Sequence, residues 1–129
     1  MRHLGIDFGT KGIGIAISDE RGGFAFPKEI IPNEQAVQRI AEMVEIEHIG
    51  AIVLGDTRAL NGRGNAVTPA AERFASSLAE QVTVPIHSVQ EAWSTVEAAR
   101  YAPKGKGHDD SAAAAIILQR YLDAHPEKS

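Results

Sequence analysis

The stretch HLGIDFGTKGIGIAIS, residues 3–18, decides the fold, because it reads as two short strands joined by a glycine-rich turn. Apolar residues alternate with small or polar ones on both sides of the turn, which is the two-residue period of a strand. In such a hairpin Asp7 lies on the face that carries almost no side-chain bulk. Strand carboxylates are usually excluded from a core. The stretch therefore predicts a carboxylate held for a metal ion or a phosphate, unless Asp7 only bonds the amides of the following turn.

Length and composition limit the classes of protein that the chain could form. The 129 residues predict one domain over residues 1–125, followed by a frayed tail at residues 126–129. The net charge of −4 counts against a large phosphate-tracking surface, but it does not exclude a nuclease whose carboxylates bind divalent ions. No apolar run is long enough to span a membrane, no signal-peptide pattern is present, and the chain has no cysteine. We expect a cytoplasmic protein with no membrane partner.

The rest of the chain predicts an α/β fold of order β-β-β-α-β-α-β-α-α. A third strand at Phe24–Ile31 contains Pro27, which indicates an edge strand or a bulge. Asn33 is the expected N-cap of the first helix, and Gly50 is expected to stop that helix. The other expected elements are strands at Ala51–Gly55 and Val84–Val89, and helices at Asn33 to about Glu47, from Thr68 and Pro69 onward, Ser94 to about Tyr101, and about Asp109 to Ala124. Three antiparallel strands followed by crossover units predict a mixed sheet with helices on both faces.

Two further carboxylates stand where ligand groups gather in such a sheet. Glu91 directly follows the predicted fifth strand, and strand ends that precede helices commonly carry binding groups. Asp110 lies in the first turn of the last helix and shares a helical face with Ala114, Ile117 and Tyr121. The plainer alternatives are a solvated loop position for Glu91 and a helix-dipole role for Asp110. The five histidines are scattered without the spacing of metal ligands.

These residues together resemble the YqgF family of RNase H-like proteins, also called RuvX or Holliday-junction resolvases. The resemblance covers nearly the whole chain. It is carried by the opening motif Gly5-Ile6-Asp7-Phe8-Gly9-Thr10-Lys11, the apolar strand ending at Gly55, Glu91 with Ser94-Thr95 behind it, and Asp110 followed by an alanine-rich helix with Ile117-Leu118-Gln119 and Tyr121-Leu122.

The resemblance implies an RNase H-like fold and a metal-dependent nuclease. It implies a site of Asp7, Glu91 and Asp110 that holds Mg²⁺ or Mn²⁺, hard ions that prefer carboxylate oxygens. The implied substrates are the precursor of small-subunit ribosomal RNA, within a ribosome precursor in the cytoplasm, or branched DNA. The residues expected to contact substrate phosphates are Thr10, Lys11, Arg63, Lys104 and Lys106.

The chain departs from the family pattern most clearly beside Glu91. The family has Asp before this position and Arg after it, whereas this chain has Gln90 and Ala92. Loss of the arginine keeps a second hypothesis open, a nucleic-acid-binding module of the same fold that does not cut. The oligomeric state is open between monomer and homodimer, and a resolvase of symmetric junctions would need the dimer.

Overall fold

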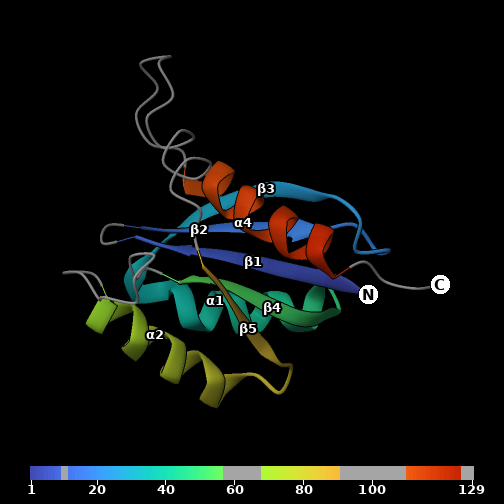
Figure 1. The fold of residues 1–129 in the computed structure, drawn as a ribbon. Helices are drawn as coiled ribbons and strands as arrows, with labels where there is room; N and C mark the ends of the chain where they lie inside the picture. Colours follow the sequence, from blue (N-terminus) through green and yellow to red (C-terminus); the bar gives the residue numbers. More distant parts are fainter. Residues whose placement is uncertain (10–11, 57–67, 91–109, 126–129) are drawn as a thin grey trace.

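The computed structural model describes residues 1–9, 12–56, 68–90 and 110–125. They form a five-stranded sheet with helices on both faces (Figure 1), which confirms the predicted α/β architecture. The strands are β1 (Arg2–Phe8), β2 (Gly12–Ser18), β3 (Ala25–Pro32), β4 (Ile49–Asp56) and β5 (Ile86–Gln90), and the helices are α1 (Asn33–Ile46), α2 (Thr68–Gln81) and α4 (Asp110–Ala124). The short helix predicted from Ser94 to about Tyr101 falls outside the described residues.

The sheet has the order β3-β2-β1-β4-β5 and is mixed as predicted. Strands β1, β2 and β3 pair antiparallel, while β4 pairs parallel with both β1 and β5. β3 is an edge strand, and its register with β2 skips a residue between the pairs Ile15–Glu29 and Ala16–Pro27. Pro27 therefore occupies an edge strand beside a bulge, where the missing N–H of a proline is tolerated.

Alternation along the strands divides the core between the two faces of the sheet. On one face Leu4, Ile6 and Phe8 of β1 are buried with apolar residues of α1 and α2. On the other face Ala16 of β2 and Val53 of β4 pack against α4, whose buried residues are Ala113, Ala114, Ile117, Leu118 and Leu122. The predicted inward stripe of the last helix is confirmed at Ala114 and Ile117, which are both fully buried.

Two local predictions about α1 are wrong. Asn33 is the first residue of the helix rather than its cap; Pro32 occupies the cap position, and no side chain caps the helix. Gly50 does not stop the helix but lies in β4, where a Cβ would collide with the side chain of Met1. The chain turns earlier, at His48, whose φ of 57° is in the left-handed region. Histidine is among the side chains that tolerate this conformation better than β-branched ones do.

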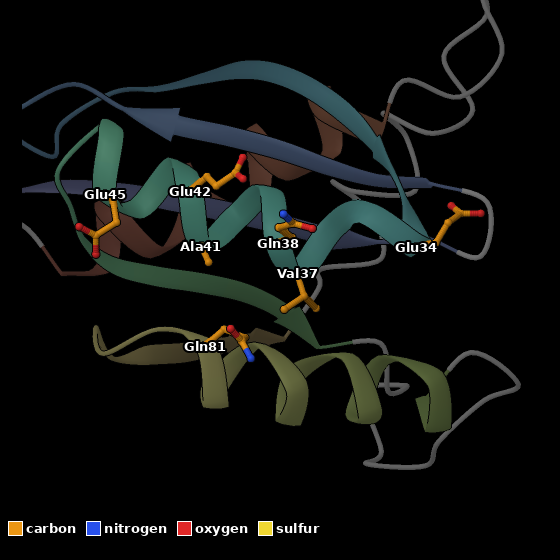
Figure 2. A pocket seen from close by; sticks show the side chains of 7 residues that line it. All are labelled: Glu34, Val37, Gln38, Ala41, Glu42, Glu45 and Gln81. Atoms are coloured by element: carbon orange, nitrogen blue, oxygen red, sulfur yellow. The ribbon is translucent and has the colours of Figure 1, made fainter.

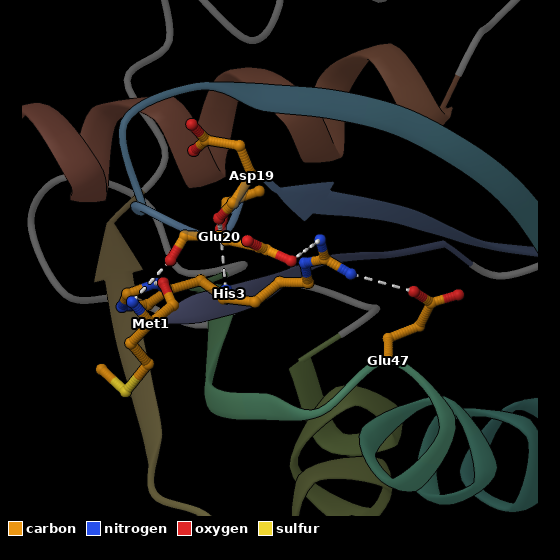
Figure 3. A network of polar contacts seen from close by, with 7 residues as sticks. Met1, His3, Asp19, Glu20 and Glu47 are labelled. Atoms are coloured by element: carbon orange, nitrogen blue, oxygen red, sulfur yellow. Dashed lines mark hydrogen bonds and ion pairs between the residues drawn. The ribbon is translucent and has the colours of Figure 1, made fainter.

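Polar contacts hold the amino end of β1 (Figure 3). The terminal amine donates to the Glu20 carbonyl at 2.7 Å, and the His3 N–H donates to Ser18 Oγ at 2.8 Å. Arg2 donates from Nη1 to Glu47 Oε1 at 3.2 Å, which ties β1 to the end of α1. These bonds lie at the end of β1 opposite Asp7. Among the helices of the described ranges, none is long and apolar enough to cross a membrane.

Candidate active site

Asp7 is a fully buried carboxylate near the carboxyl end of β1, with an exposed fraction of 0%. Its partner directly across in β2 is Gly14, and the preceding pair on the same face is Gly5 with Ala16. The predicted position of Asp7 is therefore confirmed, because its neighbours on this face of β2 are glycine and alanine. Burial of a charge is costly unless hydrogen bonds or an opposite charge compensate for it. A rigid strand thus presents one negative group on the face that α4 covers.

Three parallel strands end near the level of Asp7. β1 ends at Phe8, β4 at Asp56 and β5 at Gln90, and the pairs Ile6–Leu54, Gly55–Val89 and Asp56–Gln90 set the strands in register. The carboxyl ends of parallel strands lie at the same end of the sheet. β5 therefore ends, one residue before Glu91, at the end of the sheet that carries Asp7.

Helix α4 starts at this same edge, as its contacts with β1 show. The ring centroid of Tyr121 lies 5.8 Å from that of His3, and a Cβ added to Gly5 would lie 2.7 Å from the Cβ of Leu118 and 3.1 Å from the Ala114 oxygen. The helix therefore runs antiparallel to β1. One further helical turn, from Ala114 to Asp110, covers about 6 Å. The step along β1 from Gly5 to Asp7 covers about 6.6 Å. The backbone thus brings the start of α4 to the level of Asp7 (Figure 1).

Most other residues of the predicted site lie outside the described part of the chain. These are Thr10, Lys11, Arg63, Glu91, Lys104 and Lys106. For Asp110 the structure describes the backbone position at the start of α4. Within the described residues no three His, Cys, Asp or Glu side chains form a group that could hold a metal ion. The convergence of the three carboxylates therefore remains a prediction, supported by the backbone.

Sequence reasoning missed two arrangements. The Asn33 side chain donates from Nδ2 to the carbonyl of Gly9 at 2.9 Å and so joins the start of α1 to the residue that follows β1. His3, His87 and His125, scattered along the sequence, gather around the ring of Tyr121 with centroid separations of 5.8, 5.4 and 4.3 Å. They come from β1, β5 and the residue after α4, so their spacing along the chain holds no signal of the cluster.

A groove lies beside α1, away from Asp7 and from the histidines around Tyr121. Three carboxylates of α1, those of Glu34, Glu42 and Glu45, line it together with Gln81 at the end of α2 (Figure 2). It lies by the helices that cover the face opposite to α4. It is therefore a solvent-facing groove between two helices, separated by the sheet from Asp7.

The donor chemistry of the predicted set fits a divalent ion. Its three members are carboxylates, the hard oxygen ligands that Mg²⁺ and Mn²⁺ prefer. Asp7, the member whose side chain is described, is fully buried beside a glycine, and a cation would offset the cost of its buried charge. The residues present are compatible with a metal that Asp7, Glu91 and Asp110 would hold.

Comparisons with known proteins agree over almost the whole chain. The family model of RuvX, described as Holliday junction resolvase, matches residues 1–124. A protein of Maridesulfovibrio salexigens named "Putative pre-16S rRNA nuclease" is 38% identical over 132 residues, covering 95% of this chain and 98% of the relative. A protein of the same name from Limosilactobacillus fermentum is 36% identical, covering 97% of this chain and 95% of the relative.

Solved structures show the same fold. RuvC of Thermus thermophilus superposes with a TM-score of 0.63 at 15% identity, over 96% of this chain and 95% of that one. The same protein in complex with a Holliday junction substrate superposes with a TM-score of 0.62 over 96% and 94% of the two chains. With the family model and the curated relatives in agreement, this chain belongs to the RuvX family of Holliday junction resolvases.

Proposed function

We propose that this chain is a divalent-metal-dependent nuclease that hydrolyses phosphodiester bonds with Asp7, Glu91 and Asp110 as its metal-binding carboxylates. The proposal is supported by the position of three elements at one end of the sheet. Asp7 is buried there in β1, β5 ends one residue before Glu91, and α4 begins at Asp110. One acidic residue thus lies near the end of β1, one follows β5 and one begins α4, and these three elements meet at one end of the sheet.

The chain's own residues would bind the substrate and orient it for hydrolysis. Asp7 belongs to a strand that pairs with β2 on one side and β4 on the other, which fixes the position of its backbone. Asp7, Glu91 and Asp110 would hold the divalent ions, and that metal would supply an activated water and charge stabilisation for the leaving oxygen. The basic and turn residues Thr10, Lys11, Arg63, Lys104 and Lys106 would contact phosphate oxygens and set the register of the strand to be cut.

The proposed substrate is structured RNA or branched DNA. The two relatives are named for pre-16S rRNA, and one RuvC structure holds a Holliday junction. We therefore propose 5′ maturation of a ribosomal RNA precursor in the cytoplasm as the leading role, with branched DNA as the second substrate. The protein would act as a monomer on RNA, whereas a symmetric junction would require a homodimer.

A non-catalytic module is the second candidate. It is favoured by one specific observation, the Ala92 that follows Glu91 where the family carries arginine. A missing arginine removes a side chain that is suited to bidentate contact with a phosphate. A chain that retains the three carboxylates would then still bind metal and nucleic acid but would not cut.

The test compares the wild type with Asp7→Asn by Mn²⁺ calorimetry and by cleavage of a labelled single-stranded RNA and a four-way junction. We expect metal binding and cleavage to disappear in the variant, while the melting temperature stays the same or rises because the variant carries one buried charge fewer. Asp123→Asn, the same change at an exposed position near the end of α4, is the matched control and should leave both activities unchanged.

The other outcomes identify which part of the proposal fails. Mn²⁺ binding without cleavage by the wild type would support the non-catalytic module. No Mn²⁺ binding by the wild type would mean that the three carboxylates do not converge. Loss of folding in Asp7→Asn would show that the carboxylate is structural.

A further inference from the structure

Three aromatic rings are stacked at the carboxyl end of α4, the end that lies away from Asp7. The ring of Tyr121 is stacked with that of His125, with centroids 4.3 Å and planes 23° apart. It is also stacked with the ring of His87 in β5, with centroids 5.4 Å and planes 20° apart. Nearly parallel, offset rings are one of the arrangements that aromatic side chains prefer. We call His87, Tyr121 and His125 the ring stack.

The members of the ring stack differ in exposure, and one of them is open to a ligand. His87 and Tyr121 are half-buried, whereas His125 is exposed. The His125 ring is oriented by its contact with Tyr121 and by its Nδ1, which lies 3.1 Å from the Tyr121 carbonyl and can donate to it. An exposed ring whose orientation is already set can accept a further ring at a lower cost in conformational entropy.

A cation stands beside the ring stack. Arg120 directly precedes Tyr121, is exposed, and forms no ion pair with any residue of the described ranges. Asp123, the acidic residue in the last turn of α4, accepts a hydrogen bond from Gln119 at 3.0 Å. A guanidinium in this position is suited to a phosphate oxygen.

The histidines of the ring stack are not arranged as metal ligands. No group of His, Cys, Asp or Glu side chains in the described part of the chain could hold a metal ion. His87 and His125 meet Tyr121 as stacked rings instead. This arrangement favours a flat, aromatic ligand, and the neighbouring arginine favours a ligand that also carries a negative charge.

We propose that the ring stack and Arg120 form a second binding site for nucleic acid, which takes one unpaired nucleotide. Its base stacks on the ring of His125, and its phosphate contacts Arg120. Aromatic side chains bind unpaired bases in this way, and the contact tolerates any base because every base has a flat π face. The inference rests on the proposed function in one respect, namely that the ligand is a nucleic acid.

The ring stack lies on the same face of the sheet as Asp7 but at the opposite end of α4 (Figure 1). The ring of His3 lies 5.8 Å from that of Tyr121, and His3 and Asp7 share one face of β1. Four residues of strand cover about 13 Å. The second site is therefore separate from the candidate metal-binding carboxylates, and binding to it can be measured without a metal ion.

The experiment measures binding of a fluorescein-labelled oligoadenylate RNA by anisotropy in EDTA. His125→Ala should weaken binding by about fivefold, which corresponds to about 1 kcal/mol, the lower end for one base on one aromatic side chain. His125→Phe should bind within twofold of the wild type, because it keeps a ring while losing the Nδ1 contact. Melting temperatures show whether each variant is folded.

A matched control removes another exposed histidine. His48 follows α1, whose residues pack on the face of the sheet opposite to α4, and its φ of 57° is a conformation that asparagine also tolerates. His48→Asn should bind oligoadenylate as the wild type does.

A second ligand separates stacking of the base from attraction of the phosphates. An abasic oligomer with the same phosphates should bind His125→Ala and the wild type equally. Arg120→Gln should weaken binding of both ligands and reduce the salt dependence of the affinity, because one phosphate contact is lost. In NMR spectra the ring protons of His125 should shift upfield with oligoadenylate and not with the abasic oligomer.

The remaining outcomes separate this inference from the proposed function. Equal affinities of His125→Ala and the wild type for oligoadenylate would overturn the inference, as would a wild type that does not bind in EDTA. An equal loss in His125→Phe, or the same loss with the abasic oligomer, would also overturn it, because the effect would then not come from stacking. A wild type that binds through His125 but does not cut RNA or a four-way junction in Mn²⁺ would refute the nuclease and leave the second site standing.

Discussion

Replacement of Gly5 by alanine tests how closely α4 packs against the strand that carries Asp7. The added Cβ would lie 2.7 Å from the Cβ of Leu118 and 3.1 Å from the backbone oxygen of Ala114. Neither atom is the end of a flexible side chain, so neither can rotate away. The helix itself must shift, or β1 must bend. Both movements disturb a core in which Ala114 and Leu118 are fully buried.

The expected cost is that of overpacking a close-packed core, about 1–3 kcal/mol. At this chain length each kcal/mol lowers the melting temperature by roughly 4 °C. Urea denaturation measures the free-energy change directly, provided that the denaturant dependence is unchanged. Gly23→Ala is the matched control, because a Cβ at Gly23 meets no atom within 4 Å. It should change stability by no more than about 0.5 kcal/mol.

Gly5→Ala should also weaken metal binding at the candidate site. A helix displaced at Ala114 is displaced at its first residue, Asp110, one turn away, so Mn²⁺ affinity should fall in Gly5→Ala and not in Gly23→Ala. A Gly5→Ala variant as stable as the wild type would refute the close helix–strand contact. A destabilised variant with unchanged Mn²⁺ affinity would refute the placement of the start of α4 beside Asp7.

Two further predictions concern the core and the β2–β3 turn. Ile117→Ala removes a fully buried side chain from the α4 core and should destabilise the protein by about 2–5 kcal/mol; a cost below about 1 kcal/mol in urea denaturation would contradict the inward stripe. Hydrogen bonds from the Phe24 and Gly23 N–H groups lower the pKa of Asp19 below its usual 3.8. The folded state therefore favours the carboxylate, so Asp19 contributes stability above its unfolded pKa and loses that contribution as the pH falls through the lowered pKa. The difference in melting temperature between the wild type and Asp19→Asn should accordingly be present at neutral pH and shrink below about pH 4; a difference that does not depend on pH would contradict this.

Much of the fold could be read from local patterns. Alternation along residues 3–18 predicted the hairpin and the face without side-chain bulk on which Asp7 lies, because a strand's side chains have a period of two whatever lies around it. The structure shows that the residue opposite Asp7 on this face is Gly14. The apolar run ending at Gly55 predicted a strand, which the structure shows to be parallel to β1, and Pro27 predicted the edge or bulge that the structure contains. Among the candidate site residues, Asp7 lies on the glycine-lined face as predicted, whereas its complete burial was not predicted and comes from the structure. The elements adjoining Glu91 and Asp110 end or begin at the same end of the sheet.

Other features depend on contacts between residues far apart in sequence, and no local pattern predicts them. Asn33 has the residue type of a helix cap, but its side-chain amide donates a hydrogen bond to the carbonyl of Gly9. Gly9 lies 24 positions earlier in the sequence, and the fold places it beside Asn33. The histidines carry no ligand spacing, yet three of them, from β1, from β5 and from the residue after α4, meet at Tyr121.

The sequence by itself determined the strands, the helices and the faces on which their apolar residues lie, because these follow from the periodicity of each segment. Only the tertiary structure decided that Gly5 must lack a side chain, since the reason is the approach of Leu118 from a helix more than a hundred residues away along the chain. The same holds for the turn after Asp7, whose two flanking glycines are held by the junction of β3 and α1. Periodicity is a property of one segment, whereas these contacts exist only when two segments are brought together by folding.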